Sequence, residues 1–275
     1  MSIGGTIRKI YESRPNILKT IWVNFKVLDF YDAIKFPIIL YGRVELRGLK
    51  RGSIVFDNIM TATLRIGGGG GFYGRVPQFH TLYHNYGTHL VHGRCNILNG
   101  GIVNVTDGAV LETGKRVSIG ANVRIKCSDR IFIGDSCMVS WDVQIFDTDF
   151  HYVLVDGNKI MRNNKPVIIG NAVWIGSRVS ILKGTELPDG TIVSSNSLVN
   201  KSFVEGGGNL VLGGVPAKKI GSGKRRLMYN GDDMPSLIAV DTQLNQLFSK
   251  DKNLEQINIS DVLSMSADRE DLGAL

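Results

Sequence analysis

Aliphatic residues recur at every sixth position along the second half of the chain. Six consecutive members of this row run from Ile169 to Val199. A second row starts at Val173 and carries small or β-branched residues at the same spacing as far as Ser197. A six-residue period fits neither an α-helix nor a continuous strand, but it fits short strands joined by sharp corners around a prism. The pattern therefore predicts a triangular solenoid of stacked strands whose aliphatic row points inward.

The same period continues upstream in three aliphatic residues: Ile133, Val139 and Ile145. The interval from Ile145 to Ile169 is a multiple of six, so residues 146–168 are expected to leave the solenoid and to return in register. An earlier row that ends at Ile131 is offset by two positions from Ile133. This offset predicts a bulge or an altered corner near residues 128–130.

The repeat is absent at both ends of the chain, where the pattern predicts helices. Over residues 14–35, lysines alternate with apolar side chains at helical spacing, and we expect the packed face to include Ile17, Ile21 and Leu28. These one or two short helices are expected to cap the open first coil; docking on an anionic membrane surface is the less favoured alternative. A further helix is expected over residues 232–250.

These patterns divide the chain into three parts. Residues 1–43 are expected to form an N-terminal helical cap. Residues 44–221 form the solenoid, with the excursion over 146–168, and residues 222–275 form a C-terminal helix and an acidic tail.

The composition excludes several classes of protein. An apolar fraction of 43% is too high for a disordered chain, and the 33 glycines follow no period of three. No uncharged apolar run is long enough to span a bilayer, and charged residues interrupt the first apolar positions, so no cleavable signal is expected. The chain has three scattered cysteines, Cys95, Cys127 and Cys137. They are too few for a disulfide framework, which favours a cytoplasmic protein.

Positive charge is concentrated in two segments. Residues 1–51 hold ten Lys/Arg against four Asp/Glu, and residues 215–226 hold five Lys/Arg and no acid. The chain has no zinc-finger spacing, basic zipper or aromatic RNA-binding motif, so nucleic acid is not an expected partner. Such basic patches favour a phosphate-bearing anion.

The excursion over 146–168 carries His151, which is the only histidine within the clear repeat. Polar loops on rigid scaffolds commonly hold functional groups, and an imidazole titrates near neutral pH and accepts a proton from a hydroxyl. We therefore predict that His151 is a general base, with an ordinary surface histidine as the alternative.

Residues 148–151 and 165–176 resemble the galactoside and maltose acetyltransferases and, more closely, the bacterial surface-polysaccharide O-acetyltransferases. These are hexapeptide-repeat acyltransferases, and Phe150 stands where the sugar acetyltransferases commonly have glycine. The resemblance implies a left-handed parallel β-helix and acetyl-CoA-dependent O-acetyltransferase activity on a sugar hydroxyl in capsule, O-antigen or exopolysaccharide biosynthesis. It also implies that His151 is the general base, and that a homotrimer holds coenzyme and saccharide acceptor in the groove between neighbours.

The resemblance further implies a coenzyme-binding set: Trp174, Gly176, Ser177, Ser195, Lys201, Ala217, Lys218 and Lys219. Trp174 is expected near the pantetheine arm and the acceptor, and a backbone N–H of Gly176 or Ser177 is expected to stabilise the oxyanion. The lysines match the negative charge of coenzyme A. Three aspartates flank His151, and one of them is expected to orient the imidazole or hold a sugar hydroxyl; the alternative is that they hydrogen-bond their own turn: Asp142, Asp147 and Asp149.

Three other functions are alternatives. N-acetylation of an amino sugar or a nucleotide-linked sugar needs the same base. A metal-dependent hydratase would use a cluster of four histidines: His80, His84, His89 and His92. No metal is expected, because this cluster lies outside the clear repeat. A non-catalytic trimeric scaffold is the last alternative.

Overall fold

The described part of the chain is built mainly of stacked three-strand coils. The structure, a computed structural model, describes residues 15–68, 80–156 and 159–227, together with residues 244, 245, 248, 249 and 256. The chain divides into two units, residues 1–226 and 227–275, and the coils lie in the first. Most of the helix expected over 232–250 lies outside the described residues; the described positions within it, Leu244, Asn245, Phe248 and Ser249, are helical. No helix among the described residues is long and apolar enough to cross a membrane.

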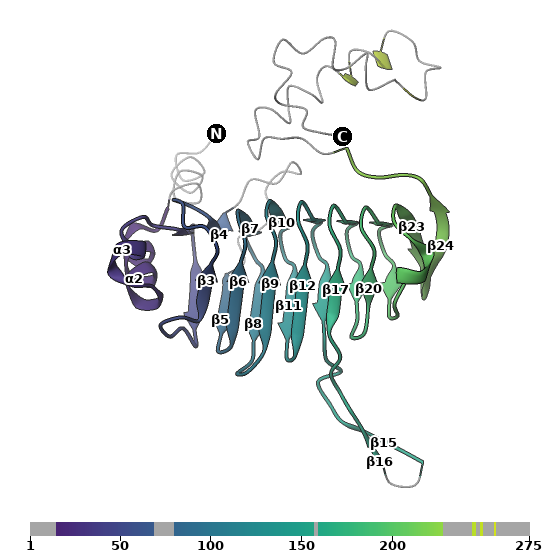
Figure 1. Ribbon diagram of the computed structural model, residues 1–275, viewed down its shortest axis with the longest axis horizontal. Helices are drawn as coiled ribbons and strands as arrows, with labels where there is room; N and C mark the ends of the chain where they lie inside the picture. Colours follow the sequence, from purple (N-terminus) through teal and green to yellow (C-terminus); the bar gives the residue numbers. More distant parts are fainter. Residues whose placement is uncertain are drawn as a thin grey trace, which may run out of the picture. The chain divides into compact units, whose positions relative to one another are not determined.

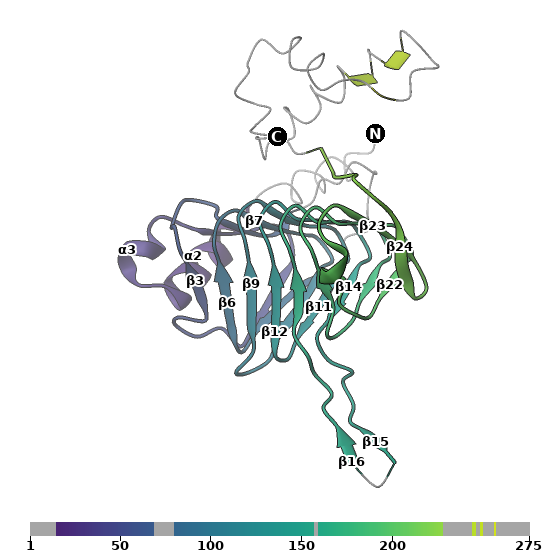
Figure 2. The same cartoon turned by 45° about the vertical axis from the view of Figure 1, so that its right-hand side comes forward.

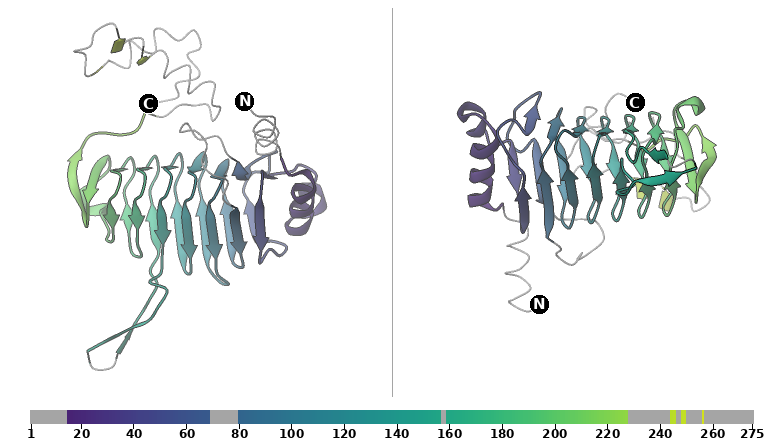
Figure 3. Two further views of the ribbon diagram at one scale, coloured as in Figure 1. Left: turned by 180° about the vertical axis from the view of Figure 1, so that it is seen from behind. Right: turned by 90° about the horizontal axis from the view of Figure 1, so that it is seen from below.

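Three sheets wrap around one core, and their strands run parallel except for the last strand of sheet 1 (Figure 1, Figure 2 and Figure 3). Sheet 1 comprises β1 (Ile38–Leu40), β4 (Leu64–Gly68), β7 (Cys95–Leu98), β10 (Val117–Ile119), β13 (Met138–Val139), β18 (Trp174–Ile175), β21 (Ile192–Val193), β23 (Leu210–Gly214) and the antiparallel β24 (Ala217–Ser222). Sheet 2 comprises β2 (Val44–Arg47), β5 (Thr81–Asn85), β8 (Ile102–Val105), β11 (Arg124–Cys127), β14 (Gln144–Phe146), β19 (Ser180–Ile181) and β22 (Leu198–Val199). Sheet 3 comprises β3 (Ile54–Phe56), β6 (Thr88–Val91), β9 (Val110–Thr113), β12 (Arg130–Ile133), β17 (Val167–Ile169) and β20 (Glu186–Leu187).

Each coil visits sheets 1, 2 and 3 in turn, and the next coil stacks on it in parallel register. We name the corners by the sheets that they join: the 1–2 edge, the 2–3 edge and the 3–1 edge. This arrangement is a parallel β-helix, so the fold class expected from the six-residue period is confirmed.

The coils become narrower along the chain. The register of paired strands shows the change. The number of residues along the chain from one partner to the other falls from the pair Val103–Ile125, to the pair Ile119–Val139, to the pair Ile175–Val193. We call residues 81–127 the wide coils and residues 167–199 the narrow coils. In the narrow coils each of the three faces takes six residues, which is why only these coils follow the six-residue period without offset.

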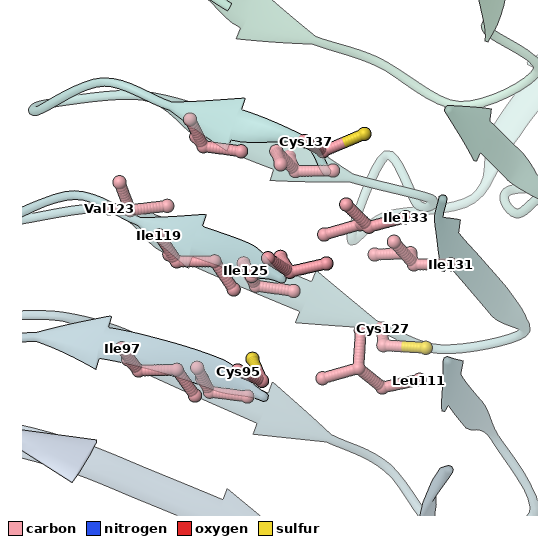
Figure 4. Close-up of a cluster of buried hydrophobic side chains, with 14 of the residues drawn as sticks. Cys95, Ile97, Leu111, Ile119, Val123, Ile125, Cys127, Ile131, Ile133 and Cys137 are labelled. Atoms are coloured by element: carbon pink, nitrogen blue, oxygen red, sulfur yellow. The ribbon is translucent and has the colours of Figure 1, made fainter. Parts of the chain in front are cut away.

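Both sequence rows point into the core. Every member of the aliphatic row from Ile169 to Val199 is buried, and so is every member of the small row from Val173 to Ser197. The hydroxyls of the small row satisfy nearby carbonyls; for example, Thr191 Oγ1 donates to the Pro188 carbonyl at 2.7 Å. Figure 4 shows part of the apolar core between the sheets. The predicted inward orientation of the rows is therefore confirmed.

The two-residue offset near 128–130 falls at the corner between β11 and β12. The chain turns from β11 to β12 at Ser128 and Asp129, and the carboxylate of Asp147 on the next coil accepts hydrogen bonds from both backbone N–H groups, each at 2.7 Å. The predicted altered corner is thus present, and a buried acid from the following coil stabilises it.

Two helices cover the first coil, α2 (Ile17–Val27) and α3 (Phe30–Ala33). Polar side chains of α2 pair with the free edge of β1: the Ile38 N–H donates to Asn24 Oδ1 at 3.1 Å, and the Leu40 N–H donates to Thr20 Oγ1 at 3.1 Å. A sheet edge that is satisfied in this way is closed to further strands. The expected packed face is wrong at two positions, since Ile17 and Ile21 are exposed. Thr20 and Asn24 take their place because a strand edge needs hydrogen-bonding partners.

The wide coils enclose an imidazole, which the narrow coils lack. His89 is fully buried, with Nδ1 2.7 Å from the Tyr83 hydroxyl and Nε2 3.1 Å from Thr113 Oγ1. Thr113 donates to the Leu90 carbonyl at 3.4 Å, so its oxygen accepts from Nε2–H, and Nδ1 accepts from Tyr83. Burial lowers the pKa of His89 from 6.5 to about 3, which keeps the imidazole neutral.

Candidate functional site

The expected excursion leaves the coils at the 2–3 edge as a projecting arm, residues 147–166 (Figure 1 and Figure 2). Its tip is the antiparallel hairpin of β15 (Val153–Val155) and β16 (Lys159–Met161), whose side chains are all exposed. Its stem is closed by backbone hydrogen bonds from Asp149 N–H to the Asn163 carbonyl at 2.8 Å and from Lys165 N–H to the Asp147 carbonyl at 2.9 Å. The stem is therefore a fixed part of the 2–3 edge.

His151 lies where the stem passes into the tip, and its side chain is exposed. The residue before it, Phe150, has φ 65°, a left-handed conformation that glycine adopts readily and other residues rarely do. Two contacts hold Phe150 there: its N–H donates to Thr148 Oγ1 at 3.1 Å, and its ring stands edge-on to Phe146 with centroids 5.2 Å apart. The glycine-like backbone is thus kept although a phenylalanine replaces the glycine of the sugar acetyltransferases.

The three flanking aspartates have different surroundings. Asp149 Oδ2 forms an ion pair with Lys183 Nζ at 2.5 Å, and the same ammonium donates to the Arg162 carbonyl at 3.1 Å, so one lysine of the next coil holds both sides of the stem. Asp147 is fully buried in the corner described above, and burial raises its pKa above the ordinary value. Asp142 is exposed on the 1–2 edge.

Among the described residues, none of these aspartates is hydrogen-bonded to the His151 imidazole. The structure gives Asp147 the alternative role of pairing with a backbone turn, and it gives Asp149 the role of fixing the stem. The expectation that Asp147 contacts a substrate is not supported, because its carboxylate is enclosed.

A second group of predicted residues meets on the 1–2 edge. Ser177 and Ser195 occupy equivalent corners of adjacent coils, and their hydroxyl oxygens are 3.2 Å apart. Trp174 stands outward on sheet 1 just before this corner, and its Nε1–H donates to Ser140 Oγ at 3.4 Å. The structure therefore brings together three of the residues predicted to line the coenzyme arm.

Gly176 belongs to this corner but not to an oxyanion hole. Its N–H donates to the Val193 carbonyl at 2.8 Å as part of sheet 1, so the expectation that it binds an oxyanion is wrong. A Cβ at this position would lie 2.7 Å from the Ser195 nitrogen, so glycine lets the two coils stack closely here. Ser177 remains the candidate donor.

The two groups lie on different edges of the prism. The whole width of sheet 2 separates Ser177 on the 1–2 edge from Lys183 on the 2–3 edge, a path of about 20 Å at about 3.3 Å per residue. A general base must come within about 3 Å of the proton that it removes. His151 and Ser177 of one chain therefore lie too far apart to act on the same thioester carbonyl.

The predicted lysines are also dispersed. Lys201 lies on the 2–3 edge, with Nζ 5.3 Å from the centre of the Phe203 ring. Lys218 and Lys219 are exposed on β24, where Ala217 is buried. All three lysines are available to an anion, but they do not form one cluster with Ser177.

The four histidines of 80–92 do not converge. Their partners differ: His80 contacts Arg43, His84 contacts Glu45, His89 contacts Tyr83 and Thr113, and His92 contacts Asp57 and Glu112. His89 points into the core and the others point outward from different sheets. No group of three or more potential metal ligands occurs in the described ranges.

The three cysteines are buried free thiols. Burial raises the pKa of Cys95 and of Cys137 to about 12, and it raises the pKa of Cys127 as well. A thiol with so high a pKa is a poor nucleophile near neutral pH. The expected core role of Cys137 is confirmed.

Sequence reasoning missed the residues that fix the stem, Lys183 and the Arg162–Asp129 ion pair at 2.8 Å. The coil length provides a signal for the first, because Lys183 follows Lys165, at the end of the arm, by the length of one narrow coil. No periodic signal marks Arg162, because the arm leaves the repeat.

Known proteins share parts of this sequence. The chain is 31% identical over 157 residues to the polysialic acid O-acetyltransferase of Escherichia coli O1:K1, a match that covers 56% of this chain and 48% of that protein. It is 29% identical over 115 residues to the galactoside O-acetyltransferase of Escherichia coli K12, covering 41% of this chain and 54% of that protein. The chain thus spans about half the length of these curated relatives.

A solved structure, that of the polySia specific acetyltransferase NeuO, aligns with 78% of this chain and 82% of its own, at 24% identity and a TM-score of 0.44. No family model matches the chain. The resemblance to hexapeptide-repeat O-acetyltransferases of bacterial sugars is confirmed by the sequence matches.

Proposed function

We propose that this protein is an acetyl-CoA-dependent O-acetyltransferase that modifies a sugar hydroxyl in surface-polysaccharide biosynthesis, with His151 as general base. The observation that carries the proposal is the stem of the arm. There the left-handed backbone of Phe150 and the Asp149–Lys183 ion pair hold an exposed imidazole at an edge of a rigid solenoid. Polar groups on loops that a rigid scaffold positions are commonly functional. The sequence similarity to sugar O-acetyltransferases supports the same activity.

In this mechanism the imidazole of His151 removes the proton from the acceptor hydroxyl as its oxygen attacks the thioester carbonyl carbon. The Ser177 N–H donates to the oxyanion of the tetrahedral intermediate. When the carbon–sulfur bond breaks, the imidazolium returns the proton to the leaving thiolate, and the products are the acetyl ester and free coenzyme A. Transfer is direct, because the buried cysteines do not supply a nucleophile.

The proposal includes a homotrimer in which the 2–3 edge of one copy faces the 1–2 edge of the next. The separation of His151 from Ser177 and Trp174 within one chain supports this arrangement, since a closed ring repeats the same pair of edges at each interface. The exposed apolar tip of the arm also supports it. An isolated two-stranded hairpin is marginally stable in water, and Leu154 and Ile160 are 68% and 66% exposed in the single chain.

Coenzyme A would lie along this groove, with Trp174 and Ser195 beside the pantetheine arm and the phosphates near Lys201, Lys218 and Lys219. Each lysine supplies a charge that suits a phosphate. We place the reaction in the cytoplasm, where acetyl-CoA is available and unpaired thiols such as the three cysteines persist.

The test is acetyl transfer by the purified protein, followed as release of free coenzyme A thiol with a panel of saccharides that offer either hydroxyls or amines. We expect turnover with a hydroxyl acceptor and its loss in His151→Ala, whereas His84→Ala, a matched change of an outward histidine in the wide coils, keeps it. Turnover with amines alone would move the assignment to N-acetylation. Full turnover in His151→Ala would reject the proposed base, and failure to bind coenzyme A in calorimetry would favour a non-catalytic scaffold.

A further inference from the structure

The helix α2 presents three distinct faces. The side toward the first coil is buried and consists of Thr20, Val23, Asn24 and Val27. A second side is apolar yet exposed and consists of Ile17, Leu18, Ile21, Trp22 and Phe25. At 3.6 residues per turn these five positions share one side of the helix. Leu18 is 82% exposed and Trp22 is 51% exposed, so covering the first coil does not account for this side.

The apolar side continues onto α3. Phe25 contacts Phe30 with ring centroids 6.0 Å apart, and Phe30 contacts Tyr31 at 5.9 Å. Phe30, Tyr31 and Ile34 are all exposed. We call the two sets together the cap face: Ile17, Leu18, Ile21, Trp22, Phe25, Phe30, Tyr31 and Ile34. Contiguous exposed apolar surface on a protein commonly marks an interaction site.

Positive charge surrounds the cap face. Lys19 and Lys26 lie on the third side of α2, between the buried and the apolar sides; Lys26 is exposed, and the Lys19 ammonium donates to the Val44 carbonyl at 2.8 Å. Residues 15–35, which include both helices, hold three lysines and two aspartates. The two acids nearest the cap face are paired with cations, Asp29 with Arg51 and Asp32 with Lys35. The surroundings of the apolar side are therefore cationic overall.

We propose that the cap face docks on the surface of an anionic lipid bilayer. Interfacial helices combine Trp, Phe and Leu on one side with lysines beside them, and they lie in the plane of the membrane with the apolar side in the headgroup region. Trp22 and Tyr31 are residue types that favour this region, and Lys26 can extend its ammonium toward lipid phosphates. A basic residue near an anionic leaflet adds to the affinity, and salt screens its effect.

The charge pattern disfavours a second copy of the chain as the occupant. Two cap faces in contact would bring two cationic surroundings together, which opposes association. An anionic surface has the complementary charge.

The inference is independent of the acetyl-transfer mechanism, since the cap face lies on α2 and α3, at the first coil, while His151 and Ser177 lie on later coils. In the cell, such docking would hold the enzyme at the membrane surface whatever acceptor it uses.

The test is co-sedimentation of the full chain with vesicles of phosphatidylglycerol and phosphatidylcholine, compared with vesicles of phosphatidylcholine alone. We expect binding to the anionic vesicles only, and its loss in high salt. The double variant Leu18→Ser/Trp22→Ser should abolish binding, and Lys26→Glu should weaken it roughly tenfold, given the contribution of each basic residue near the surface. The matched control is Val204→Ser/Ile220→Ser, which removes two apolar side chains that are 50% and 64% exposed after the last narrow coil and should keep full binding.

Thermal melting of each variant separates lost binding from lost folding, and acetyl transfer to a soluble acceptor should be unchanged in the cap-face variants. Absence of binding to anionic vesicles by the folded wild type would overturn the proposal, and so would equal loss in Val204→Ser/Ile220→Ser. A larger species in sedimentation velocity that Leu18→Ser/Trp22→Ser dissociates, without vesicle binding, would assign the face to a second copy instead.

Discussion

The wide and the narrow coils of one solenoid differ in what their interior holds. The wide coils, whose paired residues lie further apart in sequence, enclose Tyr83, His89 and Asn85. The narrow coils, whose paired residues lie closer together, enclose only aliphatic side chains, threonines and serines. Longer strands on each face enclose a wider interior, so an imidazole and a phenol ring fit in the wide coils. Six-residue faces leave room for one aliphatic residue and one small residue.

This difference bears on the candidate site. In the narrow coils, side chains one coil apart stack directly, as Ser177 does on Ser195. The edges of the narrow coils are therefore regular, and each corner packs directly on the next. These edges carry both the predicted coenzyme corner and Lys183, the anchor of the arm. The wide coils bury their polar group in the interior, where it serves folding and not chemistry.

The largest expected contrast is between His151, on the arm that Lys183 of the narrow coils anchors, and His89, which is buried in the wide coils. His151→Ala should lower turnover by about 10²–10⁴-fold, the usual contribution of a general base, and leave the melting temperature unchanged because the side chain is exposed. His89→Leu should do the reverse: it leaves the buried Tyr83 hydroxyl without its partner and lowers stability, while the folded fraction keeps its turnover. Kinetics and thermal melting of both variants check the contrast, and a melting temperature that falls in His151→Ala with no change of turnover would contradict it.

The next effect is a pH dependence of stability that originates in the wide coils. The pKa of His89 is about 3 in the folded state and 6.5 when unfolded. The unfolded chain therefore binds a proton first as the pH falls, and stability decreases between pH 6.5 and 3 by about 1.4 kcal/mol per pH unit. His92 acts in the opposite sense, because its hydrogen bond to Asp57 raises its pKa.

Urea unfolding at pH 6.5 and pH 5 measures this loss, for which His89 alone predicts about 2 kcal/mol. His89→Leu should remove it, and the opposite contribution of His92 should then become visible. An unchanged pH dependence in His89→Leu would assign the loss to other groups.

A smaller effect separates two glycines. Gly176→Ala in the narrow coils places a Cβ 2.7 Å from a backbone nitrogen, and such overpacking destabilises by about 1–3 kcal/mol. Gly108→Ala in the wide coils meets no atom within 4 Å, but its φ of +75° is unfavourable for alanine, at about 1 kcal/mol. The free energy of unfolding should therefore fall more in Gly176→Ala. The reverse order would show that close spacing of the corners does not determine the stability of the narrow coils.

The smallest effect concerns the anchor of the arm. Lys183→Ala removes a partly exposed ion pair with Asp149 and should lower stability by only about 0.2–1 kcal/mol. Because the same lysine holds the Arg162 carbonyl across the stem, its loss should reduce kcat more than it raises KM. Lys165→Ala, which changes a stem lysine that keeps its backbone hydrogen bond, is the control; equal kinetics in the two variants would argue against the anchoring role.

The sequence predicted most of the solenoid, because a repeat that buries the same position in every coil leaves the same mark in every coil. The row from Ile169 to Val199 is buried throughout, and the offset before Ile133 marked a real change of coil width. The packed face of the cap helix was predicted wrongly. The amphipathic pattern favours burial of Ile17 and Ile21, whereas the edge strand selects Thr20 and Asn24 through hydrogen bonds that no periodicity reveals.

The candidate site was only partly predictable for the same reason. Stacking of Ser177 on Ser195 follows from the coil length, but the arm leaves the repeat, and its contacts through Arg162 and Asp149 depend on how the stem folds back. The role of Gly176 was predicted wrongly because its N–H is part of sheet 1, which a motif match does not show.

The proposed site is assembled from two edges of neighbouring copies. The most direct test of this arrangement is co-expression of His151→Ala, which damages the 2–3 edge, with Ser195→Trp, which fills the 1–2 edge. Each variant alone should be inactive. With random assembly of equal amounts, each mixed trimer has one interface in three that combines two intact edges, which is about one quarter of all interfaces. About a quarter of wild-type turnover should therefore return. A mixture that stays as inactive as its parts, although mixed trimers form, would contradict the account.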